Sequence, residues 1–448
     1  MALLTRPTVS RIHRRQILKA GAAALGAAPV FRLRPTTARQ LGEKLRVAAV
    51  GVANKGGDDL HHVAASPNVR VVALCDVDST FLDRAAQQYP AARKFADYRK
   101  MLDQASQEFD AVIVGTPDHM HGSIAIAAMS LGKHVYVEKP LAHNLAELRR
   151  MATLAEDNRL TTQMGTQIHS HETYRTAVEM IRQGTIGKVR EAHAWVGSRL
   201  PLLAASRPDK ADPVPASLDW DLWQGVAPQR PYVDGLYHPF HWRMWRDYGG
   251  GILGDMGCHI FDPIFSALQL GPPLSVESAG PVHPHDTFAP DGDVTLTFAS
   301  TPYTSGELTL RWTHGTAKPR AELAQLPPGA SLPDGGSFVV GERGVMVLPH
   351  WAMPSFYRDG APLEVDLTSA GSVDHYVQWA DACRGEGQTS TPFSYAAKVT
   401  EAVLVGVVAG GLPPQRLAWD SANLRFDSSE ANALVKRRYR EGWRPSGV

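Results

Sequence analysis

Cysteine is scarce in this sequence, since its 448 residues include only Cys75, Cys258 and Cys383. An odd number at such wide spacing supports neither a disulfide framework nor a zinc-binding motif. Charge of one sign is also lacking, because 46 Lys and Arg residues balance 45 Asp and Glu residues, so no net field attracts nucleic acid. We find no internal repeat and no stretch that is long and apolar enough to span a membrane. These absences favour small-molecule chemistry, without a nucleic-acid partner or a membrane anchor in the mature chain.

The first residues carry the pattern of an export signal. The segment "SRIHRRQILKAGAAALGAAPVF" places Arg14 and Arg15 before a weakly apolar run of alanine and glycine. That order resembles a twin-arginine signal, which we predict over residues 1–38, and it indicates a periplasmic or other extracytoplasmic location. The alternative is a solvated basic helix or an extension without regular structure. Because the twin-arginine route carries folded proteins, a cofactor bound in the cytoplasm can travel with the chain.

A dinucleotide-binding pattern begins at residue 45. In "LRVAAVGVANKGG" an apolar strand runs into a turn, where Gly51, Ala53 and Gly56 occupy the three positions of the dinucleotide fingerprint. Ala53 replaces the middle glycine and weakens the pattern, but a second strand, "VRVVALCDVD", brings Asp76 20 residues past Gly56 (76 − 56). A carboxylate at that spacing can bind the adenosine ribose hydroxyls and would repel a 2′-phosphate, so NAD is predicted in preference to NADP.

Strand and helix periods continue to alternate after this unit, which predicts an α/β fold. The segments "FDAVIVGTP", "HVYVEKP" and "TTQMG" have strand patterns and are separated by helical ones, so a Rossmann domain is predicted over residues 44–165. Ligands of such sheets bind beyond the carboxyl ends of the strands. The residues expected on this cofactor side are Gly51, Ala53, Asn54, Lys55, Gly56, Asp76, Thr116, Pro117, Asp118, His119, Glu138, Lys139 and Pro140.

The strand in "KHVYVEKPLAHN" ends on a charged pair, Glu138 and Lys139, followed by Pro140. Its carboxyl end is where the nicotinamide is expected, and Pro140 cannot continue the strand. Lys139 is therefore a candidate catalytic group. The alternative is a surface lysine paired with Glu138, which is the ordinary situation of a lysine.

A second candidate group lies in "DYGGGILGDMGCHIFDPIFSALQLG". If the segment from Leu253 is helical, Asp255, His259 and Asp262 lie on one stripe of the helix. An aspartate so placed can set the pKa and tautomer of the histidine, as a general base requires. The alternative is a capping aspartate beside an ordinary packed histidine.

The segments "GVANKG", "CDVD", "TPDHMHG", "EKP" and "GGGILGDMGCHIFD" together resemble the Gfo/Idh/MocA family of nicotinamide-dependent sugar and cyclitol oxidoreductases. The resemblance covers almost everything after residue 44. It implies a Rossmann domain followed, over residues 166–448, by an α/β domain with an open, mainly antiparallel sheet, and a homo-oligomer formed through that sheet. It also implies that Lys139, Asp255 and His259 are the catalytic groups. Strand patterns in "VREAHAWVGS", "DVTLTFAS" and "SGELTLRWTH" agree with such a sheet.

Residues 219–250 are rich in aromatic side chains, which suit the apolar CH faces of a sugar ring. From this segment we predict His238, His241 and Arg243 as substrate-binding residues. His119 and His121 in "DHMHG" suggest a metal site, but no matching ligands occur at usable spacing, so no metal is predicted.

The predicted function is hydride transfer between a sugar or cyclitol hydroxyl and a tightly bound NAD, with either Lys139 or His259 as the formal base. Export would separate the protein from free NAD. An alternative is therefore a redox-neutral glycosidase, which oxidises C3 of a glycoside, eliminates the aglycone, adds water and reduces C3 again. A second alternative is a non-catalytic NAD-binding sensor, because a fold does not determine a function.

Overall fold

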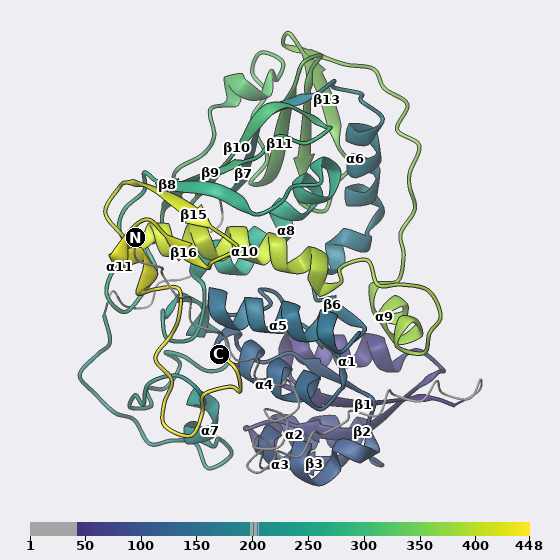
Figure 1. Cartoon of the computed structure of the whole chain (residues 1–448), viewed down its shortest axis with the longest axis vertical. Helices are drawn as coiled ribbons and strands as arrows, with labels where there is room; N and C mark the ends of the chain where they lie inside the picture. Colours follow the sequence, from purple (N-terminus) through teal and green to yellow (C-terminus); the bar gives the residue numbers. More distant parts are fainter. Residues whose placement is uncertain (1–42, 198–199, 201–203, 205) are drawn as a thin grey trace, which may run out of the picture. The chain divides into compact units, whose positions relative to one another are not determined.

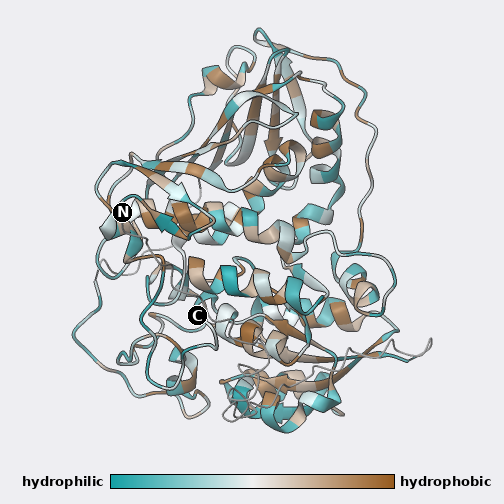
Figure 2. Cartoon of the chain, viewed as in Figure 1, coloured by the Kyte–Doolittle hydropathy of each residue, from teal (hydrophilic) through white to brown (hydrophobic). Residues whose placement is uncertain are grey.

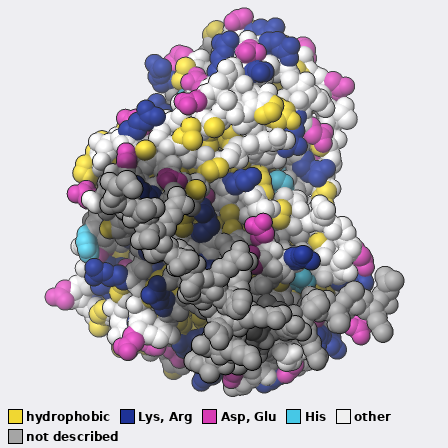
Figure 3. All heavy atoms as spheres, viewed as in Figure 1, with side chains coloured by type: hydrophobic (Ala, Val, Ile, Leu, Met, Phe, Trp, Pro, Cys, Tyr) yellow, Lys and Arg dark blue, Asp and Glu magenta, His cyan; other side chains and the backbone are white. Residues whose placement is uncertain are grey.

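The computed structural model describes residues 43–197, 200, 204 and 206–448. The twin-arginine signal predicted at residues 1–38 lies outside the described residues. On the face shown in Figure 3, Lys and Arg side chains are interspersed with Asp and Glu, as the balanced composition predicts.

A six-stranded parallel sheet forms the nucleotide-binding half, in the order β3-β2-β1-β4-β5-β6. This order reverses between β1 and β4, which is where such folds bind dinucleotides. The predicted Rossmann fold is confirmed. The strands are β1 (Leu45–Val50), β2 (Val69–Cys75), β3 (Arg93–Phe95), β4 (Ala111–Val114), β5 (His134–Val137) and β6 (Thr162–Met164).

Helices cover both faces of this sheet, which allows strands such as β4 to be wholly buried and apolar. Those from the first half are α1 (Asn54–Ala64), α2 (Ser79–Gln88), α3 (Tyr98–Ala105), α4 (Asp118–Ser130) and α5 (Leu145–Asp157), with the 3₁₀ turn η1 (Ser106–Glu108). Asp78 and Asp97 cap α2 and α3 with their carboxylates. One covering helix comes from far along the chain, because α9 (His375–Cys383) lies beside α1 (Figure 1). Its Trp379 ring packs on Tyr136 of β5.

The second half contains a ten-stranded sheet in the order β14-β13-β12-β11-β7-β10-β9-β8-β15-β16. Only the pairing of β7 with β10 is parallel, so the predicted mainly antiparallel sheet is confirmed. Hydrophobic residues run along the strands of this sheet (Figure 2). Its strands are β7 (Val189–Val196), β8 (Pro273–Ser278), β9 (Gly292–Phe298), β10 (Thr304–His314), β11 (Gly335–Gly341), β12 (Val345–Pro349), β13 (Ser355–Arg358), β14 (Ala361–Pro362), β15 (Arg416–Asp420) and β16 (Arg425–Phe426).

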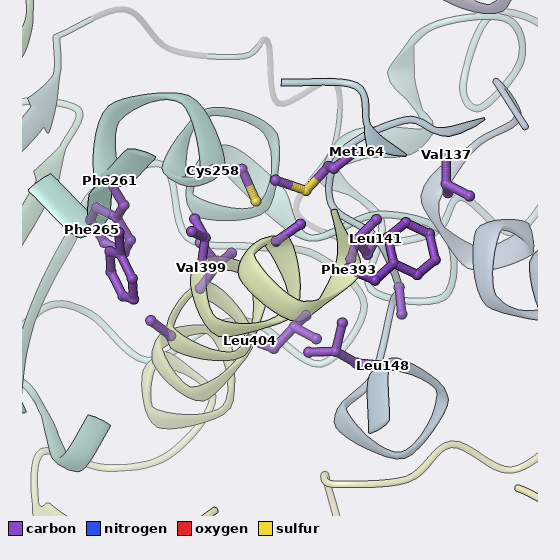
Figure 4. Close-up of a cluster of buried hydrophobic side chains, with 14 of the residues drawn as sticks. Val137, Leu141, Leu148, Met164, Cys258, Phe261, Phe265, Phe393, Val399 and Leu404 are labelled. Carbon is purple, nitrogen blue, oxygen red and sulfur yellow. The ribbon is translucent and has the colours of Figure 1, made fainter. Parts of the chain in front are cut away.

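Two long helices, α8 (Gly251–Leu268) and α10 (Phe393–Gly410), pack on the second sheet, and α10 also packs on α5 of the nucleotide-binding half. Figure 4 shows side chains of both halves around α10, with Leu141 and Leu148 on one side and Cys258 and Phe261 on the other. The remaining elements are η2 (Gln167–Ser170), α6 (Glu172–Arg182), α7 (Trp220–Gln224), η3 (His241–Met244), η4 (Ala321–Ala324) and α11 (Ser429–Asn432).

The expectation that no stretch is long and apolar enough to span a membrane is wrong for α10. Its 18 residues have a mean hydropathy of 1.3, which is sufficient by length and composition alone. However, 72% of the helix is buried inside the protein. Its apolar character is explained by its position between α5, α8 and the second sheet.

Candidate active site

A cavity of about 540 Å³ opens at the carboxyl ends of the parallel strands. It brings together most of the residues predicted on the cofactor side, and it extends to residues of the second half. Its lining includes Gly51, Ala53, Asn54, Lys55, Asp76, Thr116, Pro117, Asp118, Glu138, Lys139, His238, Arg243 and Asp255.

The turn between β1 and α1 has the close packing that a dinucleotide loop requires. Gly51 has φ +78°, and a Cβ on Gly56 would lie only 2.2 Å from the Gly51 carbonyl oxygen. Gly56 is therefore needed for packing and does not itself line the cavity. Asp76 binds this turn, because its carboxylate accepts hydrogen bonds from the backbone N–H of Val52 at 2.9 Å and of Asp78 at 3.0 Å.

These features fit NAD. The amino end of α1 faces the cavity, where backbone N–H groups and the helix dipole can bind a pyrophosphate. Asp76 is held at the end of β2, where a carboxylate binds ribose hydroxyls. Among the described residues, no group of three or more His, Cys, Asp or Glu side chains is placed to hold a metal ion.

Lys139 and Asp255 form an ion pair across the cavity. The Lys139 ammonium donates to the Asp255 carboxylate at 2.9 Å and to the Asp255 backbone carbonyl at 2.7 Å. The Arg243 Nε donates to the same carboxylate oxygen at 3.2 Å. Lys139 is therefore not the surface lysine of the alternative interpretation, since only 13% of its side chain is exposed.

The charges of this group keep it ionised despite its burial. Burial alone would lower the pKa of Lys139, but the negative charges of Asp255 and Glu138 raise it above its ordinary value. Burial likewise opposes ionisation of Asp255, yet Lys139 and Arg243 hold its pKa at about 2. The lysine is thus a fixed cation at the predicted nicotinamide position.

Asp118 is a second carboxyl in the same cavity, at the first residue of α4. One of its oxygens accepts a hydrogen bond from the Gly250 N–H at 3.2 Å, just before α8. Burial raises the pKa of Asp118 to about 7, although the charges of Lys139 and Arg243 act in the opposite direction. Two carboxyls with separated pKa values next to one lysine are typical of acid–base sites. The sequence placed Asp118 on the cofactor side because it follows β4, but the sequence could not show that its carboxyl is buried.

His259 lies one turn after Asp255 on α8, as the stripe predicts, but the expected hydrogen bond between them is not formed. The Asp255 carboxylate is occupied by Lys139 and Arg243, and His259 Nδ1 is buried without a partner among the described residues. Burial, with the charges of Lys139 and His350, lowers the pKa of His259. The ring is therefore neutral at ordinary pH, and the same burial and neighbouring charges oppose its protonation.

The third residue of the stripe, Asp262, orients a different histidine. Its carboxylate lies 2.9 Å from Nδ1 of His169, in η2, and accepts a hydrogen bond from the Tyr395 hydroxyl at 2.7 Å. A carboxylate-to-histidine contact is thus present on α8, but it is made by Asp262, two turns after Asp255, and to a histidine that follows β6.

Lys55 binds a buried acidic pair instead of pointing freely into the cavity. Its ammonium contacts Asp59 and the Tyr376 hydroxyl, the latter at 3.0 Å, and lies 3.7 Å from Glu138. Burial and the charge of Glu138 raise the pKa of Asp59 well above its ordinary value. Tyr376 belongs to α9, so no local sequence pattern could have placed it beside the nucleotide loop.

Three predicted site residues lie elsewhere than expected. His119 is buried with its Nε2 3.0 Å from the Trp223 carbonyl, and it is His121 that lines the cavity. The His241 Nδ1 donates to the Gly235 carbonyl, away from the cavity lining. His238 lines the cavity at the Asp76 end, where its Nε2 is 3.2 Å from the Asp78 carboxylate. Only Arg243 of the predicted substrate residues contacts the Lys139 and Asp255 pair.

Comparison with known proteins places both halves in one group. A sequence model described as "Oxidoreductase family, NAD-binding Rossmann fold" matches residues 45–166. A second, described as "Oxidoreductase family, C-terminal alpha/beta domain", matches residues 195–302. The Glycosyl hydrolase family 109 protein 2 of Shewanella sp. (strain ANA-3) is 29% identical over 161 residues, covering 34% of this chain and 35% of that protein. The chain thus spans about a third of the length of this curated relative.

Solved structures share the fold at lower identity. The WlbA dehydrogenase from Bordetella pertussis, in complex with NADH and UDP-GlcNAcA, has a TM-score of 0.62 and 18% identity, covering 84% of this chain and 99% of that one. The aldose-aldose oxidoreductase from Caulobacter crescentus, complexed with glycerol, has a TM-score of 0.57 and 16% identity, covering 84% of this chain and 100% of that one.

We predict that Asp118→Asn becomes progressively more stable than the wild type as pH rises from about 4 to 7. Folding raises the Asp118 pKa to about 7, so the folded state keeps a proton that the unfolded chain releases, and the wild type loses stability over this range. Thermal unfolding with saturating NAD at a series of pH values measures the difference. The control is Asp103→Asn, at an exposed position on α3. Parallel curves for the wild type and Asp118→Asn would contradict the assignment.

Proposed function

We propose that this chain, which belongs to the Gfo/Idh/MocA family of oxidoreductases, transfers a hydride between a sugar or cyclitol hydroxyl and a tightly bound NAD. The observation that carries the proposal is the Lys139 and Asp255 ion pair, which lines the same cavity as the nucleotide loop. When NAD is bound, it supplies the hydride acceptor. The chain supplies the charge, the proton acceptor and the position of the hydroxyl.

Lys139 acts on the charge that develops on the substrate oxygen. Negative charge builds on the carbinol oxygen as the hydroxyl proton leaves ahead of the hydride, and the charge disappears when the carbonyl forms. A fixed ammonium beside that oxygen lowers the barrier, because it need not reorganise during the reaction. Asp255 keeps the ammonium charged and fixes its direction through two contacts.

His259 is our candidate for the group that takes the hydroxyl proton. It is neutral because of its burial, and its Nδ1 has no partner within the described part of the chain. His259 is 8% exposed and lies outside the cavity lining, one helical turn from Asp255. As the base it would take the hydroxyl proton through a water molecule or after a small movement of the ring.

We expect Lys139→Ala to retain NAD but to reduce it with substrate about 100- to 1000-fold more slowly than the wild type, because the alkoxide loses its countercharge. The measurement is the absorbance of the bound nicotinamide after mixing with a panel of sugars and cyclitols. Lys188→Ala, at an exposed lysine far from the cavity lining, is the control.

Normal turnover by a folded, NAD-loaded Lys139→Ala variant would contradict the catalytic role of Lys139. A wild-type protein whose NAD responds to no member of the panel would instead support the non-catalytic sensor.

A redox-neutral glycosidase is the second candidate, and two observations favour it. The curated relatives include proteins named as glycosyl hydrolases, and Asp118 adds an acid–base group whose pKa lies near 7. Such a cycle needs more proton transfers than a dehydrogenase does. Oxidation at C3 acidifies the C2 proton, the aglycone leaves C1, water adds, and the hydride returns to C3.

The two candidates differ in what happens at C2. For the glycosidase we expect aryl glycoside cleavage in D₂O to place deuterium at C2 of the released sugar without net reduction of NAD, since the C2 proton exchanges with solvent during elimination. Nuclear magnetic resonance of the product measures the deuterium. Product without deuterium at C2, or one NADH formed per sugar, would exclude the redox-neutral glycosidase and support the dehydrogenase.

Export by the twin-arginine route and retention of NAD are proposed together, because an exported enzyme needs a cofactor that stays bound. We expect near-stoichiometric NAD in protein purified without added nucleotide and a mature chain lacking residues 1–38. Denaturation followed by absorbance and mass measurement tests the first, and N-terminal sequencing of the periplasmic protein tests the second. An empty protein that binds NAD reversibly would contradict the retention.

A homo-oligomer formed through the second sheet stays a prediction, which size measurements in solution can test.

A further inference from the structure

One end of the cavity is enclosed by residues that lie far apart in the sequence. Asp76 marks this end as the site of the adenosine ribose, since a carboxylate at the end of β2 has that role in dinucleotide folds. The cavity lining near Asp76 includes Phe81 and Tyr98 from the first half of the chain. It also includes His238 and Trp443 from the second half.

The segment before α7 is joined to the loop that follows Asp76. The Ser79 N–H donates to the Ser217 carbonyl at 2.8 Å, and the Asp219 N–H donates to the Val77 carbonyl at 2.9 Å. These two bonds fix the start of α7 directly beside the adenosine end.

His238 extends the same wall. Its Nε2 lies 3.2 Å from the carboxylate of Asp78, which caps α2, and its ring centroid lies 5.6 Å from that of Phe81. His238 therefore lies against the ribose side of the cavity.

The C-terminal segment supplies the remaining part of this enclosure. Trp443 is only 8% exposed although it lies five residues from the end of the sequence (448 − 443). The Arg99 guanidinium lies 3.9 Å from the Trp443 ring centroid, within cation–π distance. Arg99 is in turn held by Asp97, at 2.7 Å.

Arg440 fastens the C-terminal segment to α7. Its guanidinium pairs with the Asp221 carboxylate and donates to the Asp221 carbonyl at 2.9 Å. It also lies 5.0 Å from the Trp443 ring centroid. Figure 1 shows the C-terminal segment, in yellow, running past α7. Residues 437–448 lie outside both matched sequence models.

We propose that Trp443 is a cofactor-binding residue, held by Arg99 and Arg440, which closes the adenosine end of the cavity and slows the release of NAD. The inference rests on the proposed retention of NAD by this enzyme. A dinucleotide that leaves past Trp443 displaces this ring, and such movement breaks its contact with Arg99 or the link between Arg440 and α7. Affinity differences between related complexes act mainly through such dissociation rates.

The test measures how fast NAD leaves the full-length protein. The wild type and variants are loaded with radiolabelled NAD and chased with excess unlabelled NAD, and bound label is followed with time. We expect Trp443→Ala to release NAD about 10-fold faster or more, as truncation of a buried aromatic contact typically does. Trp443→Phe, which keeps an apolar ring, should restore most of the retention. Trp351→Ala is the control, since Trp351 is 48% exposed and outside the cavity lining.

Arg440→Ala is an independent variant that leaves the tryptophan in place but removes its link to Asp221, and it decides the matter if Trp443→Ala does not fold. Faster release from Arg440→Ala supports the proposal. Release rates within about 2-fold of the wild type for both variants, whenever both fold, would overturn it. If both variants release NAD as slowly as the wild type, only the role of Trp443 is contradicted and the proposed retention of NAD stands. A wild type that releases NAD within seconds contradicts the retention itself.

Discussion

Lys139 reaches from the end of β5 to α8, where its ammonium contacts both the carboxylate and the backbone carbonyl of Asp255. This buried ion pair joins the nucleotide-binding half to the second half at the reacting end of the cavity. Removing two charges from water is costly, so such a pair is weak evidence for stability. Its value here is positional, because it fixes a cation where the nicotinamide is expected and determines which other groups can ionise nearby.

The electrostatics of the cavity follow from that pair. Asp255 stays ionised beside Lys139, with a pKa of about 2, while burial raises the pKa of the neighbouring Asp118 to about 7. His259, on the same helix as Asp255, is kept neutral by its burial. The cavity is thus lined by a fixed cation, a fixed anion and a carboxyl that can exchange a proton, while His259 lies outside the lining. That combination would serve the proposed dehydrogenase, and Asp118 would supply a further proton transfer for a redox-neutral glycosidase.

The two halves of the chain are interleaved around the cofactor. The second half returns α9 to the nucleotide sheet, where Tyr376 binds Lys55, and it returns the C-terminal segment to the adenosine end. The apolar helix α10 packs between the halves, against α5 of the first and α8 of the second. Residues of both halves therefore line the predicted cofactor cavity.

The sequence by itself determined the local elements and the faces they bury. Hydrophobic periodicity placed the parallel strands and α8, and the spacing from Gly56 to Asp76 placed the ribose carboxylate, because such patterns repeat within one element or one βαβ unit. Only the tertiary structure decided the partners: Asp255 binds Lys139 instead of His259, and Trp443 lines the same cavity as Gly51. Periodicity defines which face of a helix is buried but not which distant side chain meets it, since that depends on how separate elements pack and compete for the same charge.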